Sequence, residues 1–133
     1  LYSNLGESYG RLGHYQAALT SFRTATDLDP QFSKAFYNMA NTFFALGDTA
    51  AAIDIYKKSI ALKPEFAPAA NNLGAAYLKA GQISEAFQSF ARALRLNPQY
   101  EEAFANLYNL SIQCPWQRRE FSKFKNACSH FPA

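Results

Sequence analysis

Residues 1–30 read LYSNLGESYGRLGHYQAALTSFRTATDLDP, and the same spacing of residue types returns further along the chain. The period is 34 residues, and it is marked by four prolines: Pro30, Pro64, Pro98 and Pro132. Glycines keep the same interval about half a period away: Gly13, Gly47 and Gly81. A repeat of this length predicts small supersecondary units that stack on one another.

Each unit has helical spacing. In the second repeat, apolar residues recur every three or four positions along two segments, which predicts two amphipathic helices. Gly47 stands where the first helix must stop and turn, and Pro64 ends the second because proline cannot continue a hydrogen-bonded helix. The predicted helices cover residues 1–12, 16–28, 34–46, 50–62, 68–80, 84–96, 102–113 and 117–129.

The predicted fold is therefore all-α, a right-handed α-solenoid of antiparallel helix pairs. We expect one domain over residues 1–133, built from four repeats: 1–32, 33–66, 67–100 and an atypical 101–133. Because Leu1 falls inside a predicted helix, the first repeat is expected to be truncated at its start and the chain to be a piece of a longer protein.

Composition narrows the function classes. Apolar residues are 49% of the sequence, enough for a continuous core, and the net charge of +3 is mild and dispersed. Neither feature indicates nucleic acid or an anionic membrane as a partner. No apolar run is long enough for a membrane helix and no signal peptide is visible, so we expect a soluble, cytoplasmic protein.

The pattern resembles the tetratricopeptide repeat family along the whole chain. Repeat one fills every position of the family motif: Tyr2, Leu5, Gly6, Tyr9, Ala18, Phe22, Ala25 and Pro30. Repeat three departs at Ala70, and repeat two has Ser59 in place of an alanine. The resemblance implies a module that binds other polypeptides on its concave surface.

Small residues in the motif have a packing explanation. We expect Gly6 and Gly74 to be small because the partner helix, bearing Ala18 and Ala86, crosses close by, while the aromatics fill the space between units. Gly10 is likewise interpreted as helix packing. Repeat four is irregular, with a Cys114-Pro115-Trp116 turn, which is typical of a terminal repeat that caps a stack. Its basic last helix has two interpretations, a solvated cap face or a docking surface.

One column on the first helices is uniform, with an asparagine in each repeat: Asn4, Asn38, Asn72 and Asn106. We call these four residues the asparagine ladder. Asparagine is only a middling helix former, so the column needs another reason. Two interpretations stand: the amides help to hold neighbouring helices, or each amide pairs with the N–H and C=O of an extended peptide.

Flanking columns are predicted to face the same groove and to add side-chain selectivity. They are Tyr37, Asn41, Phe44, Asn71, Leu78, Lys79, Asn109, Ile112 and Gln113. Lys34 and Lys79 are its expected cations and Glu7 and Glu102 its anions. Phe44, Leu78 and Ile112 have an alternative place, buried between repeats.

A carboxylate clamp of the kind that many co-chaperone repeats use is not expected. That clamp needs lysines and an arginine beside its asparagines, and here the corresponding positions are Ser3, Glu7, Pro68 and Asn72, so only Asn38 matches. The sequence also predicts no catalytic site, metal or cofactor, since His14 and His130 stand at opposite ends and no nucleophile has a base at usable spacing.

The unbroken ladder and the Cys114 to Trp116 turn also resemble the repeat region of O-linked N-acetylglucosaminyltransferases. That resemblance implies an arm that brings substrate proteins to a following enzyme domain. The sequence is therefore compatible with three functions: a peptide-binding or partner-helix-binding module, a recruiting arm of a larger enzyme such as a glycosyltransferase, and a scaffold that self-associates through its repeat ends.

Overall fold

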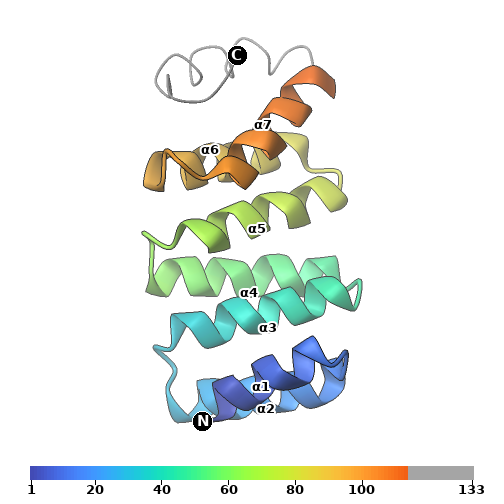
Figure 1. Ribbon diagram of the computed structural model, residues 1–133, viewed down its shortest axis with the longest axis vertical. Coiled ribbons are helices and arrows are strands. Elements are labelled where there is room, and N and C mark those ends of the chain that lie inside the picture. The colour runs from blue at the N-terminus through green and yellow to red at the C-terminus, as the bar shows by residue number, and fades with distance from the viewer. Residues whose placement is uncertain (114–133) are drawn as a thin grey trace. The chain divides into compact units, whose positions relative to one another are not determined.

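A computed structural model describes residues 1–113 of the chain. Within this range the chain is helical with short connections, as Figure 1 shows, and the predicted all-α fold class is confirmed. The helices are α1 (Tyr2–Arg11), α2 (Tyr15–Leu28), α3 (Ser33–Ala45), α4 (Thr49–Leu62), α5 (Ala67–Lys79), α6 (Ile83–Leu96) and α7 (Glu101–Gln113). The predicted helix 117–129 and the Cys114-Pro115-Trp116 turn lie outside the described residues.

The turn inside each repeat is closed by glycine, as predicted. Gly13, Gly47 and Gly81 have φ of 78°, 86° and 80°, a left-handed conformation that residues with a Cβ rarely adopt. After each glycine the next amide reaches back into the helix, for example from Asp48 N–H to the Phe43 carbonyl at 3.0 Å. This pairing satisfies carbonyls that the helix end would otherwise leave without a partner.

Contacts along the chain divide it into two compact units, Leu1–Glu65 and Phe66–Ala133. The first unit holds α1 to α4, two antiparallel hairpins that Figure 1 shows in blue to green. Its core includes Leu19 and Phe22 of α2, which pack with Met39 of α3. The second helix of repeat one therefore covers the first helix of repeat two.

The second unit is held by an alanine-rich and aromatic core. Phe87, Phe90 and Leu94 of α6 lie in one buried cluster with Leu107 and Leu110 of α7. The α5–α6 hairpin and the following helix α7 thus repeat the packing seen in the first unit, with the second helix of repeat three against the first helix of repeat four.

Glycines of the first helices follow their predicted role at Gly6 and Gly74 but not at Gly10. A Cβ placed on Gly6 would lie 2.6–2.9 Å from three ring atoms of Phe22, and one on Gly74 would lie 2.7 Å from the ring of Phe90. The partner helix of the same repeat therefore makes these positions small, as expected, and the atoms nearest to them belong to its aromatic ring. At Gly10 a Cβ would meet nothing within 4 Å, so the prediction of helix packing there is wrong.

Repeat two is closed by a serine pair where the family motif has an alanine. Ser33 Oγ donates to the Ser59 carbonyl at 2.9 Å, and Ser59 Oγ donates to the Ser33 carbonyl at 3.0 Å. Both serines are buried. The two reciprocal bonds tie the start of α3 to the end of α4.

Candidate functional site

The asparagine ladder occupies one register on the first helix of each repeat. Asn4 lies on α1, Asn38 on α3, Asn72 on α5 and Asn106 on α7. Asn4 is exposed, whereas the other three side chains are half-buried. A pair of ladder amides therefore belongs to each compact unit, Asn4 with Asn38 and Asn72 with Asn106.

In the first unit, Glu7 orients the ladder amide of the next repeat. Asn38 Nδ2 donates to Glu7 Oε1 at 2.9 Å, and Lys34 Nζ lies 3.5 Å from the same oxygen. The Lys34 side chain is well exposed, so the ion pair itself contributes only about 0–1 kcal/mol. The more buried amide bond to a charged acceptor is the stronger of the two contacts, at about 1.5–3 kcal/mol.

In the second unit, the ladder is joined through Asn71. Asn106 Nδ2 donates to Asn71 Oδ1 at 3.1 Å, and Asn71 Nδ2 lies 3.4 Å from Asn72 Oδ1. We predicted that Asn71 faces the groove, but its side chain is fully buried, at 0% exposure. Its amide is used to connect the two ladder amides of the unit, because a buried polar group needs hydrogen-bond partners inside the protein.

Two of the ladder amides, Asn38 and Asn106, keep hydrogen-bonding capacity after these contacts. Asn38 and Asn106 each use one N–H, and within residues 1–113 their side-chain oxygens accept no hydrogen bond. One acceptor and one donor thus remain on each amide. That is the set needed to pair with the N–H and C=O of a peptide backbone.

The predicted flanking residues differ in how far their side chains are exposed. Tyr56, a buried residue of α4, donates its hydroxyl hydrogen to Asn41 Oδ1, and its ring lies 6.2 Å from that of Tyr37, tilted by 53°. Tyr37, Asn41 and Phe44 are half-buried on α3. Lys79 and Asn109 are exposed, as are Leu78 and Ile112.

A pocket of about 300 Å³ lies in the first unit, between α1, α2 and α3. It is lined by Gly6, Glu7, Gly10, Arg11, Tyr15, Phe22, Asn38, Asn41 and Thr42. The predicted site residues Asn38 and Asn41 lie together in it. Sequence reasoning missed Arg11 and Tyr15 as site residues, although the pocket had a signal: Gly10 stands in the column that holds Phe44 in the next repeat.

Residues 1–113 contain no group of three or more His, Cys, Asp and Glu side chains placed to hold a metal ion. None of the helices α1 to α7 is long and apolar enough to cross a membrane. What the described site offers is hydrogen bonding by amides beside an aromatic and charged pocket.

Antiparallel helix pairs that recur along the chain are the arrangement of an α-solenoid. A model of the tetratricopeptide repeat family matches residues 3–67 and again residues 37–101. The chain belongs to the tetratricopeptide repeat family, whose fold is generally a non-catalytic, protein-binding module. A search of curated proteins finds no match.

Solved structures agree on the fold. The crystal structure of MamA superposes with a TM-score of 0.84 at 24% identity, covering 96% of this chain and 74% of that one. The first TPR of Spaghetti (RPAP3), bound to the HSP90 peptide SRMEEVD, has a TM-score of 0.82 at 27% identity and covers 84% and 89%. The O-GlcNAc transferase of Thermobaculum terrenum has a TM-score of 0.77 at 24% identity over 83% of this chain and 21% of that one.

Proposed function

We propose that this chain binds an extended peptide segment of a partner protein, and that the ladder amides pair with the peptide backbone. The observation that carries the proposal is the state of Asn38 and Asn106. Each amide is fixed by a hydrogen bond to the preceding repeat, through Glu7 and Asn71, and each retains a side-chain oxygen without a donor in the described part of the chain. Fixed amides lose less entropy when they bind than mobile ones do.

Helix spacing supports the same reading. Packed helices lie about 8–10 Å apart, and an extended chain advances about 3.3 Å per residue. Neighbouring first helices of one unit would therefore meet a peptide at roughly every third residue or at a larger interval. Because a hydrogen bond contributes only about 0.5–1.5 kcal/mol net, the ladder amides give modest affinity and little sequence selectivity.

Peptide binding by a related fold supports the partner class, since the RPAP3 repeat was solved with the peptide SRMEEVD. The acidic nature of that peptide does not transfer. In this chain the groove cation Lys34 is paired with Glu7, and lysines of a carboxylate clamp are missing at the matching positions Ser3 and Pro68. We expect a partner segment that is recognised through its backbone and not through a terminal carboxylate.

The experiment begins by selecting random linear peptides on the full chain and measuring the affinity of the best peptide by isothermal titration calorimetry. Asn38→Ala and Asn106→Ala are each expected to weaken binding by about two- to tenfold, the value of one hydrogen bond. Gln88→Ala, an exposed change on the second helix α6, is the matched control and should bind as the parent chain does. Unchanged affinity in both ladder variants, with circular dichroism also unchanged, would contradict the proposal.

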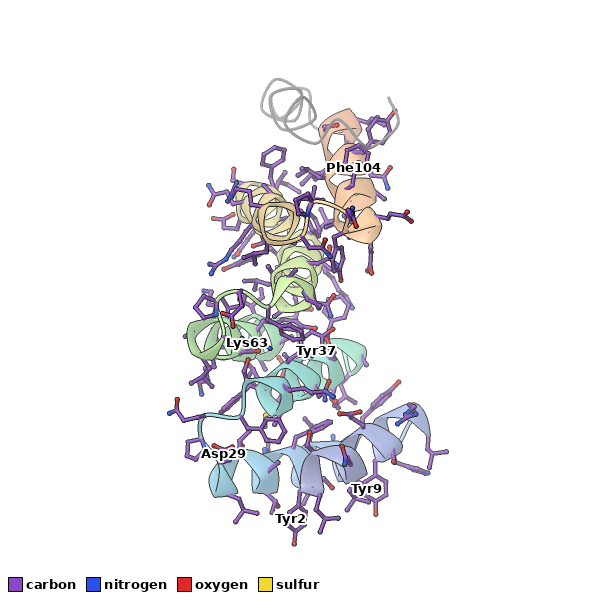
Figure 2. The ribbon with its side chains drawn as sticks, turned by 60° about the vertical axis from the view of Figure 1, so that its left-hand side comes forward. Tyr2, Tyr9, Asp29, Tyr37, Lys63 and Phe104 are labelled. Atoms are coloured by element: carbon purple, nitrogen blue, oxygen red, sulfur yellow. The ribbon has the colours of Figure 1, made fainter. Side chains whose placement is uncertain are left out.

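Self-association is a second candidate, and the apolar face of α1 favours it. Tyr2 and Leu5 are 40% and 42% exposed, whereas Met39, which stands one period after Leu5, is 5% exposed beneath α2. Figure 2 shows the labelled Tyr2 side chain on the side of the first hairpin away from α3. We propose that a second copy of the chain covers this face. Sedimentation equilibrium should then show a dimer that Leu5→Glu dissociates, and a monomer at every concentration would refute it.

A further inference from the structure

One position of the repeat is a glycine in repeat one and a large apolar residue in the other three. The residues at this register are Gly10, Phe44, Leu78 and Ile112. Three repeats thus place a large apolar side chain where repeat one has only a hydrogen atom. Because a Cβ on Gly10 would meet nothing within 4 Å, the missing side chain is not replaced by a neighbour.

The space beside Gly10 is the pocket of about 300 Å³ in the first unit. Gly6 and Gly10 lie four residues apart on α1 and so on one face of the helix, and both line the pocket, Gly6 beside the ring of Phe22. Phe22 and Tyr15 of α2 add aromatic walls. A cavity of about 150 Å³ lined by apolar groups is known to hold a benzene ring, so a pocket of this size has room for an aromatic side chain.

Two charged residues line the pocket, the anion Glu7 and the cation Arg11. Glu7 is occupied by Lys34 and Asn38, whereas Arg11 has no ion pair or hydrogen bond through its side chain within residues 1–113. An arginine at the mouth of a pocket can lie over the face of an aromatic ring, to which its cation is attracted. The aromatic lining and this cation favour a ring over a branched aliphatic side chain.

We propose that this pocket is the anchor subsite of the groove and holds one aromatic side chain of the bound peptide, with Arg11 against the ring. The inference rests on the proposed function, because the peptide is the same one whose backbone pairs with the ladder amides. The pocket would add selectivity for one side chain, which the ladder amides do not provide. A peptide would be chosen by an aromatic residue that fills the position left by Gly10.

The test uses three short amidated peptides of glycine and serine whose central residue is phenylalanine, cyclohexylalanine or glutamate. Binding to the full chain is followed by the amide shifts of Gly6, Gly10 and Asn38 in nitrogen–proton correlation spectra. The phenylalanine peptide should bind about two- to fivefold more tightly than the cyclohexylalanine peptide, which has the same bulk without a π face. Arg11→Met should remove that preference. Equal affinity of these two peptides, or tighter binding of glutamate, would overturn the proposal.

A second variant fills the pocket from within. Gly10→Phe restores the aromatic that repeat two has at Phe44, and the open space at Gly10 admits it. It should weaken the phenylalanine peptide about tenfold or more, since the apolar burial of the ring is lost. Ser8→Phe, an exposed change on the same helix, is the matched control and should not alter affinity.

Failure of this inference is distinguishable from failure of the proposed function. If Gly10→Phe binds a selected peptide normally while Asn38→Ala weakens it, the groove binds peptides but the pocket is not its anchor. If Gly10→Phe weakens the selected peptide and Asn38→Ala does not, the pocket is an anchor and the ladder is structural.

Discussion

Alanine at Gly6 and alanine at Gly10 form a matched pair on one helix with opposite expected effects. Neither glycine has a positive φ, so both substitutions should gain helix propensity of about 0.5–1 kcal/mol. At Gly6 the new methyl group would lie 2.6–2.9 Å from three ring atoms of Phe22, whose side chain is 2% exposed, so the ring or the helix would have to shift. At Gly10 it would meet nothing.

Overpacking of a core typically costs about 1–3 kcal/mol, and that cost applies to Gly6→Ala only. After the propensity gain is subtracted, Gly6→Ala should lower the free energy of unfolding by up to about 2 kcal/mol, and Gly10→Ala should raise it by about 0.5–1 kcal/mol. Ala40 fills this position in repeat two. The expected cost therefore comes from the fit against Phe22 and not from the backbone.

Urea unfolding followed by circular dichroism measures both changes, and an unchanged dependence of the free energy on urea shows that the comparison is sound. Gly74→Ala should repeat the Gly6 result, because its Cβ would lie 2.7 Å from the ring of Phe90. Equal stability of Gly6→Ala and Gly10→Ala would refute the reasoning, since the two differ only in what the methyl group meets.

Other stability effects follow from single contacts and can be measured by the same unfolding assay. Gly47→Ala should cost about 1–2 kcal/mol because the turn needs φ of 86°. Ser59→Ala removes one of two reciprocal bonds with Ser33 and should cost about 1 kcal/mol, although it restores the residue of the family motif. Asn71→Ala should cost about 1–3 kcal/mol as the buried amide link is lost, whereas the exposed Asn109→Ala should stay within about 0.5 kcal/mol; equal effects would contradict the amide network.

Much of the fold could be predicted from local signals. A fixed period, glycine turns and prolines after the second helices place each helix of residues 1–113 within one residue of its observed bounds, because these signals act on the backbone of their own segment. The residue closest to Gly6 could not be read in this way. Whether Ala18 or Phe22 comes closest depends on how two helices cross, which spacing along one helix does not specify.

The site was predictable as a register but not as a set of contacts. The column of Asn38 and Asn106 follows from the period alone. Its partners Glu7 and Asn71 do not, because they lie 31 and 35 residues away and are chosen by side-chain geometry between helices. Asn71 shows most clearly what the repeat period does not predict. Its side chain is fully buried, whereas that of the neighbouring ladder residue Asn72 is half-buried.

Backbone recognition by the ladder is tested most directly with a selected peptide in which one amide nitrogen at a time is methylated. Methylation removes a single N–H and leaves every side chain in place. The affinity should fall by about two- to tenfold at the positions whose N–H pairs with Asn38 or Asn106, and the same methylation should have no effect on the chain that carries Asn38→Ala with Asn106→Ala. Equal losses in the parent and the double variant, or no loss at any position, would contradict the account.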